Sequence, residues 1–70
     1  MAKRITVWIG DDKDVLYNHQ FEMIIPTRMH RILTDFDMDE YEDQWDALCD
    51  MIDNEHPELP RSWYIDKIAW

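Results

Sequence analysis

The clearest structural signal in the sequence is the segment DMDEYEDQWDALCDMID, residues 37–53. Its apolar residues recur at steps of 3, 4, 3, 1 and 3, as expected for one side of an α-helix, and they are Met38, Tyr41, Trp45, Leu48, Cys49 and Ile52. Asp37 is a suitable N-cap, and Asp39 with Glu40 suits the positive end of a helix dipole. The segment therefore predicts an amphipathic helix that ends near Asp53 and buries its apolar side.

A β-hairpin near the N-terminus is the element that such a helix would cover. Apolar residues alternate with other residues over 5–9 and again over 17–25, which is the period of a half-buried strand. The glycine and acids of residues 10–14 predict a turn or short loop between the two strands. The predicted core side of this hairpin consists of Ile5, Val7, Ile9, Phe21, Met23 and Ile25.

Two further segments complete the predicted fold. Pro26-Thr27 is a start signal for a short helix with Met29, Ile32, Leu33 and Phe36 on one side. Residues 62–70 are rich in strand formers, and they are compatible with a third strand or a terminal helical turn. The sequence thus predicts a single α+β domain over residues 1–70, with a small antiparallel sheet and one or two α-helices packed on one face.

The small size of the chain limits its core. A 70-residue domain buries only about 60% of the surface that its unfolded chain exposes. Self-association is a common reinforcement for such a core, so a homodimer is one expectation. The single cysteine, Cys49, allows no intrachain disulfide and is expected to be a buried thiol.

The negative charge of the chain is concentrated in one third of the sequence. The formal net charge is -9. Residues 35–58 hold eleven acids and no Lys or Arg, whereas the remainder holds five acids and seven bases, so the two parts carry -11 and +2. Such a block opposes folding through self-repulsion, and a surface that served only solubility would mix both signs.

The acids of the predicted helix are spaced to form a stripe on its outer side. Five aspartates follow one another at steps of 4, 3, 4 and 3, with two glutamates at the margin; the set is Asp39, Asp43, Asp46, Asp50, Asp53, Glu40 and Glu42. The stripe would span about 21 Å, over which one DNA strand presents about six phosphates. The simpler interpretation is a solvated face, but unrelieved like charges three and four residues apart are destabilising. We therefore predict that the seven acids bind a basic partner.

Calcium binding is disfavoured by the same segment. Residues 35–39 have the D-x-D-x-D spacing that opens a calcium loop. The sixth position of such a loop is glycine and the twelfth is glutamate, but here they are Glu40 and Asp46. A helix over the same residues also excludes the loop, so we expect no metal site.

Catalysis finds little support in the sequence. One glycine cannot build a phosphate-binding loop. The remaining candidates are one serine, one cysteine and three histidines scattered along the chain, namely Ser62, Cys49, His19, His30 and His56. Outward-facing carboxylates lack the concave pocket that acid/base chemistry needs. We expect no enzymatic activity, no catalytic residues and no cofactor.

The same composition limits where the protein acts and what it binds. The apolar run at residues 5–9 is too short for a signal peptide, and no stretch is long enough to span a membrane. The predicted location is the cytoplasm, without membrane association. Direct binding to nucleic acid is disfavoured because the net field repels a polyanion.

In size, charge block and acid spacing, the chain resembles the small acidic DNA-mimic proteins that bacteriophages make to inhibit host proteins. Within that group it looks most like Bacillus-phage inhibitors of the histone-like protein HU, and the likeness is carried mainly by residues 37–53. The resemblance implies a host takeover function in the bacterial cytoplasm, in which the acids occupy a DNA-binding surface. HU is then the leading candidate partner. The alternative is an interaction module whose specificity resides in exposed tryptophans, Trp8 or Trp70, with the acids serving solubility.

Overall fold

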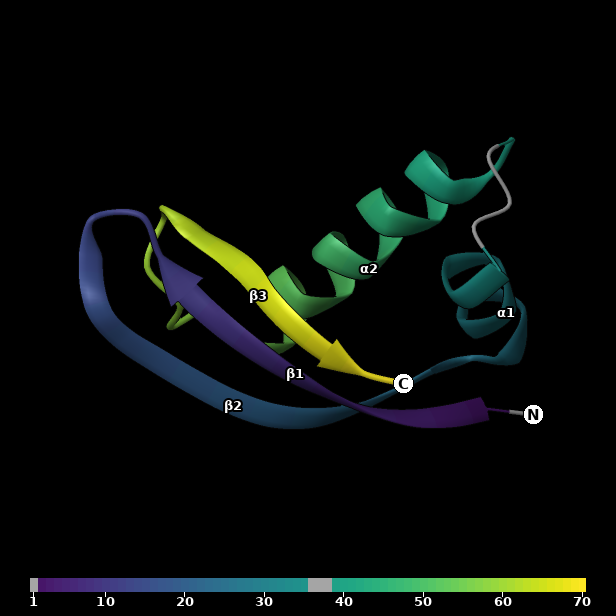
Figure 1. The fold of residues 1–70 in the computed structure, drawn as a ribbon, viewed down its shortest axis with the longest axis horizontal. Coiled ribbons are helices and arrows are strands. Elements are labelled where there is room, and N and C mark those ends of the chain that lie inside the picture. The colour runs from purple at the N-terminus through teal and green to yellow at the C-terminus, as the bar shows by residue number, and fades with distance from the viewer. Residues whose placement is uncertain (1, 36–38) are drawn as a thin grey trace.

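The computed structural model describes residues 2–35 and 39–70 and contains three strands and two helices in those ranges (Figure 1). In chain order the elements are β1 (Ala2–Asp11), β2 (Asp14–Pro26), α1 (Thr27–Asp35), α2 (Tyr41–Glu55) and β3 (Trp63–Ala69). The predicted α+β class is confirmed. None of the helices in the described ranges combines the length and the apolar character needed to cross a bilayer.

The sheet is antiparallel with the strand order β2-β1-β3, so β1 is the central strand. Val7 lies opposite Phe21 of β2 and opposite Ile68 of β3, which places apolar residues of all three strands on one side. This register confirms the predicted core side of the hairpin. It also resolves the two forms left open for the C-terminal segment, because residues 63–69 form a strand that pairs with β1.

The predicted loop at residues 10–14 is wrong in its extent. Gly10 belongs to β1, and Asp11 pairs with Asp14 across a two-residue turn. Gly10 faces Tyr64 of β3 so closely that an added Cβ would lie 2.5 Å from the Tyr64 Cζ atom. The glycine therefore marks a close approach between two strands and not a turn, which is the second meaning of a glycine in a strand.

Asp11 closes this end of the sheet. Its carboxylate accepts hydrogen bonds from the Ser62 hydroxyl and, at 3.0 Å, from the Lys13 backbone N–H. The Asp12 N–H donates to the Ser62 carbonyl oxygen at 3.2 Å. These bonds join the hairpin turn to the segment that leads into β3. They also hold the pKa of Asp11 below its ordinary value, with the Ser62 hydrogen bond as the largest cause.

The first helix is confirmed, and the second begins later than predicted. Helix α1 buries Met29, Ile32 and Leu33, while Phe36, the fourth residue predicted on that side, lies outside the described residues. Helix α2 begins at Tyr41 and ends at Glu55, so the predicted start near residue 37 is wrong. The predicted N-cap, Asp37, also lies outside the described residues. Glu40 occupies the capping position without a side-chain cap, and its carbonyl oxygen accepts the Gln44 N–H at 3.0 Å.

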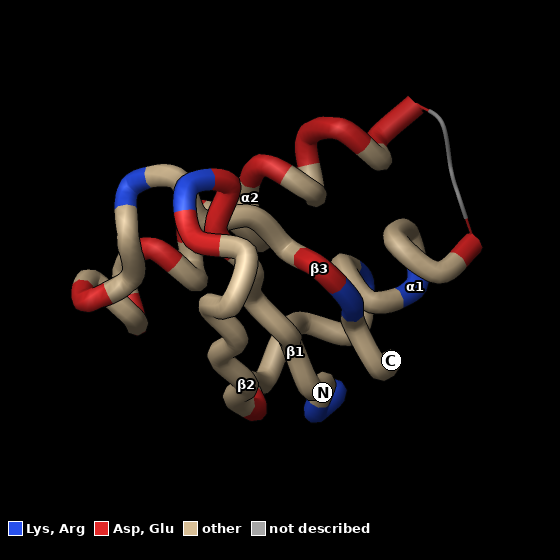
Figure 2. Tube along the Cα trace, turned by 60° about the vertical axis from the view of Figure 1, so that its left-hand side comes forward, with Lys and Arg blue, Asp and Glu red and all other residues tan. Residues whose placement is uncertain are grey.

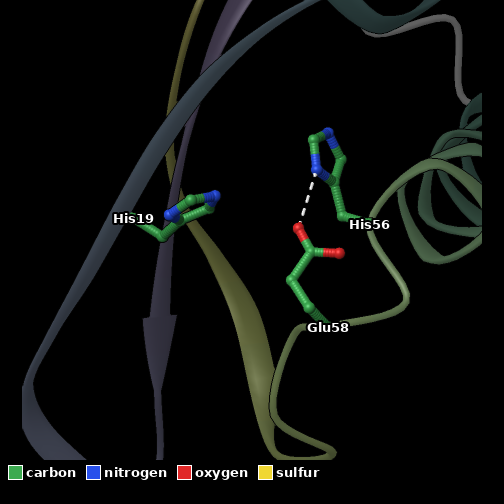
Figure 3. Close-up of side chains that lie close together, drawn as sticks. All are labelled: His19, His56 and Glu58. Carbon is green, nitrogen blue, oxygen red and sulfur yellow. Dashed lines mark hydrogen bonds and ion pairs between the residues drawn. The ribbon is translucent and has the colours of Figure 1, made fainter.

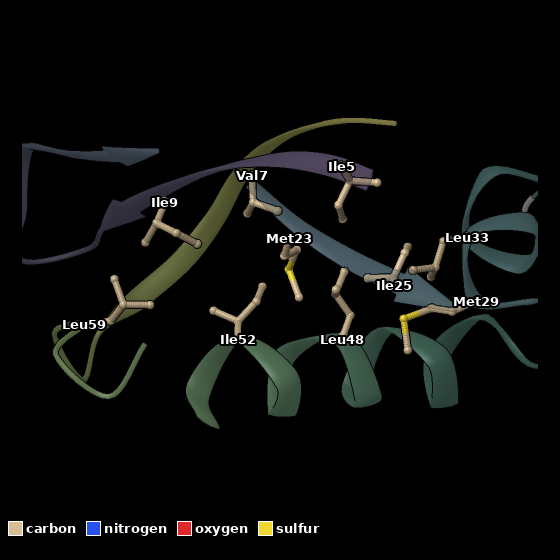
Figure 4. Packing of buried hydrophobic residues seen from close by; sticks show 10 residues of the cluster. All are labelled: Ile5, Val7, Ile9, Met23, Ile25, Met29, Leu33, Leu48, Ile52 and Leu59. Atoms are coloured by element: carbon tan, nitrogen blue, oxygen red, sulfur yellow. The ribbon is translucent and has the colours of Figure 1, made fainter. Parts of the chain in front are cut away.

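The core lies between one face of the sheet and the two helices (Figure 4). Its buried members are Ile5, Val7, Ile9, Met23, Ile25, Met29, Leu33, Leu48, Ile52 and Leu59. Tyr41 and Trp45, which the helical spacing placed in the core, are half-buried at its margin, with their rings stacked at 6.1 Å. The core is therefore almost wholly aliphatic, and the homodimer expected from its small size stays a prediction.

Candidate functional site

The acidic side of α2 faces away from the core. Helix α2 carries six exposed acids, of which Glu55 is its last residue; the other five are Glu42, Asp43, Asp46, Asp50 and Asp53. At about 100° per residue they fall within an arc of roughly 100° around the helix axis. Leu48 and Ile52, which have no exposed surface, lie on the opposite side. We call these five residues the acidic face; Figure 2 shows the acids following α2 along its length.

The acidic face has the charge density of a nucleic-acid strand. From Glu42 to Asp53 the helix rises about 16 Å, at about 1.5 Å per residue. One strand of DNA presents about five phosphates over that length, because phosphates follow one another at about 3.4 Å. Five carboxylates on about 16 Å of helix therefore match a phosphate row in number over the same axial length.

The two acids before the helix differ from the five on it. Asp39 is exposed in the turn that precedes α2, so it does not continue the helical stripe as predicted. Glu40 is half-buried, and its Oε1 lies 2.5 Å from the Nη2 of Arg28 on α1. The charge of Glu40 is thus offset by a cation of the same molecule. Five of the seven predicted acids therefore share one side of α2, whereas Asp39 and Glu40 lie before the helix; the binding role of all seven stays a prediction.

The lysines and arginines lie on elements other than α2. They are found near the N-terminus, in the β1–β2 turn, on α1, in the α2–β3 connection and on β3 (Figure 2). Among the described residues, no Lys or Arg forms an ion pair with Asp43, Asp46, Asp50 or Asp53. Within the described part of the chain, these four carboxylates are therefore available to the cations of another molecule.

The carboxylates of the acidic face affect the pKa of the Cys49 thiol. Cys49 is half-buried on α2, between the apolar side and the acids. Burial raises the pKa of its thiol, and the carboxylates of Asp46 and Asp50 raise it further. The thiol is therefore a weak nucleophile at neutral pH, and its ionisation reports the local negative potential.

The tryptophans proposed as partner anchors are engaged within the molecule. The Nζ of Lys67 lies 5.1 Å from the ring centroid of Trp8, which is half-buried on the sheet face away from the helices. Trp70 meets the ring of His30 edge-on at 5.9 Å, and its carbonyl oxygen lies 3.2 Å from the His30 Nε2. Both rings keep some exposed surface, but each already has an intramolecular partner.

Two of the histidines that were treated as scattered lie close together. The ring centroids of His19 and His56 are 6.2 Å apart, and the His56 Nδ1 lies 3.2 Å from Oε1 of Glu58. The pKa of Glu58 is lowered, first by a hydrogen bond from its own backbone N–H and then by the bond to His56. Sequence reasoning missed this cluster because 37 positions separate His19 from His56 along the chain. Only His56 and Glu58, two residues apart after the helix, are close in the sequence and could have indicated part of the cluster.

No family model, curated protein or solved structure matches the chain. A function for the protein is therefore inferred from its own residues and their arrangement. The resemblance to phage DNA mimics stays a prediction.

Proposed function

We propose that the protein is an inhibitor that presents the acidic face of α2 to the basic DNA-binding surface of another protein and competes with DNA there. The observation that carries this proposal is the alignment of five exposed carboxylates on about 16 Å of one helix. A DNA-binding surface has lysines and arginines placed to meet phosphates at a similar density. The acidic face offers such a surface a substitute polyanion.

The firm anchoring of α2 favours a binding role for its acids over the alternative that they only form a solvated surface. Leu48 and Ile52 anchor α2 in the core, which fixes the backbone positions that carry the acids. Repulsion between neighbouring acids costs the folded protein stability. A function that needs the charges in that place explains why the chain keeps them without lysines or arginines beside them.

The partner is defined by its chemistry, as a basic DNA-binding protein. HU is the leading candidate that the resemblance names, and the proposed compartment is the host bacterial cytoplasm. Long-range attraction between the two surfaces would accelerate association, and added salt would weaken it. The protein would need no contact with nucleic acid itself.

Displacement of DNA from HU tests the proposal. We expect the wild-type protein to release a labelled duplex from HU in a gel-shift titration. The variant Asp43→Lys/Asp46→Lys/Asp50→Lys should lose this inhibition, because it replaces three members of the acidic face with cations. Its matched control, Asp12→Lys/Glu22→Lys/Asp66→Lys, makes the same change in net charge at three exposed positions away from α2. Equal loss in both variants would show that net charge alone acts, and full inhibition by the first would refute the proposal.

The tryptophan alternative makes a different prediction. If Trp8 or Trp70 anchored the partner, Trp8→Ala or Trp70→Ala would abolish binding and the charge-reversal variant would retain it. Affinity would then change little between low and high salt. Because the structure engages both rings internally, we expect the opposite pattern, with binding that depends on salt and survives either alanine substitution.

A further inference from the structure

Three side chains of types that can ligate a metal lie together at the far end of α2 from its first turn. His19 projects from β2, His56 follows the last residue of α2, and Glu58 lies in the connection to β3 (Figure 3). One ligand atom from each of the three side chains lies within 4.8 Å of the other two. The cluster therefore joins two parts of the chain that are distant in sequence.

The surroundings hold the two imidazoles in place. The ring of Phe21 lies 3.9 Å from that of His56 and 5.8 Å from that of His19, measured between centroids. The backbone of His56 is also fixed, because its N–H donates to the Ile52 carbonyl oxygen at 2.8 Å and its carbonyl oxygen accepts the Leu59 N–H at 3.2 Å. Both of those partners are buried in the core. Such support orients ligand side chains in advance of binding.

The donor set selects the kind of ion. Two imidazoles and one carboxylate suit Zn²⁺ and similar transition metals, whereas Ca²⁺ and Mg²⁺ prefer oxygen ligands alone. A tetrahedral ion with bonds of about 2.0–2.1 Å holds its ligand atoms about 3.4 Å apart. Ligand atoms already within 4.8 Å reach this spacing through small side-chain rotations.

The outer side of the cluster is open. The side chain of Glu58 is 60% exposed, whereas that of His56 is 22% exposed, so the carboxylate forms the solvent side and the imidazole the inner side. Three protein ligands would leave a fourth position for water. An ion there would bridge β2 to the α2–β3 connection, which adds the kind of cross-link that small cores use.

We propose that His19, His56 and Glu58 form a binding site for one divalent transition-metal ion of the Zn²⁺ class, which ties β2 to the segment after α2. The site is separate from the acidic face and does not depend on the proposed inhibition. It also differs from the sequence expectation, which assigned no metal ligands.

Calorimetric titration of the 70-residue chain with Zn²⁺ tests the proposal, with excess Mg²⁺ present to occupy weak carboxylate sites. We expect one ion per chain. His19→Gln and His56→Gln should each weaken binding by at least about tenfold, which is the loss seen when even the outer partners of metal ligands are removed. Glu58→Gln, which keeps a hydrogen-bonding group beside His56, should also weaken it. The matched control is His30→Gln, because His30 is the one histidine outside the cluster.

Co²⁺ provides a spectroscopic readout that separates ligation from folding. The wild type and the variant Cys49→Ser should give the same visible absorption of a tetrahedral site, and His19→Gln should lose it while its circular dichroism stays that of a folded protein. The charge-reversal variant of α2 should keep the site. Binding of several weak ions that Mg²⁺ displaces, unchanged affinity in His19→Gln, or an equal loss in His30→Gln would each overturn the proposal.

Discussion

Removal of one carboxylate from the centre of the acidic face should stabilise the protein. Asp46 has acids three or four positions away on α2 at Glu42, Asp43 and Asp50. Each such like-charge pair costs about 0.2–0.5 kcal/mol, so Asp46→Asn should raise the free energy of unfolding by about 0.6–1.5 kcal/mol at low salt. In a domain of this size, 1 kcal/mol corresponds to a shift of about 4–8 °C in the melting temperature.

Asp43→Asn is the matched comparison on the same helix. It removes the same charge, but Asp43 lies in the first turn, where a carboxylate gains about 0.3–1 kcal/mol from the helix dipole. Its only neighbour of like charge at such spacing on α2 is Asp46. The gain and the loss nearly cancel, so we expect no stabilisation or a small destabilisation.

Thermal and urea unfolding, followed by circular dichroism at low and at 1 M salt, would measure both variants. The stabilisation by Asp46→Asn should shrink at high salt, because exposed charges are screened over about 3 Å under those conditions. Equal effects of the two substitutions, or a gain from Asp46→Asn that salt leaves unchanged, would refute the idea that the acidic face is a self-repelling array.

Three other predictions concern separate parts of the fold. Because Asp46 and Asp50 raise the pKa of Cys49, the variant Asp46→Asn/Asp50→Asn should lower that pKa. The pH dependence of iodoacetamide alkylation would measure it, and an unchanged profile would contradict the effect of these two carboxylates on the thiol. The lowered pKa of Asp11 contributes stability that is present above the ordinary pKa of 3.8 and is lost as the pH falls through the lower folded value. Ser62→Ala removes the main cause of that shift, so the stability of this variant, measured by urea unfolding across a pH series, should depend less on acid pH. Gly10→Ala should destabilise the protein by about 1–3 kcal/mol through its clash with the Tyr64 ring, and the cost should largely disappear in a Tyr64→Ala background in a double-mutant cycle.

Local periodicity accounts for the parts of the fold that could be predicted. The alternation around Val7 and the helical spacing around Leu48 each follow from which side of an element is buried, and the structure confirms both. The role of Gly10 was missed because it depends on Tyr64 of β3, a strand that the sequence left open. Composition alone cannot distinguish a turn glycine from one that permits close contact between strands.

Long-range contacts account for the parts of the site that could not be predicted. The pairing of Glu40 with Arg28 requires knowledge of how α1 lies relative to the start of α2. The meeting of His19 and His56 requires the position of β2 relative to the end of α2. Neither contact produces a regular spacing of residues in the sequence. The acids of α2 do have such a spacing, because they all lie on one helix.

The most direct test of the central claim is the salt dependence of competition with DNA. The inhibition constant for displacement of a labelled duplex from HU would be measured over a range of salt concentrations, for the wild type and for the variant Asp43→Asn/Asp46→Asn/Asp50→Asn/Asp53→Asn. If these carboxylates substitute for phosphates, affinity should fall steeply with salt for the wild type, and the slope should decrease by up to about one for each carboxylate removed. The same affinity and the same slope for both proteins would contradict the account.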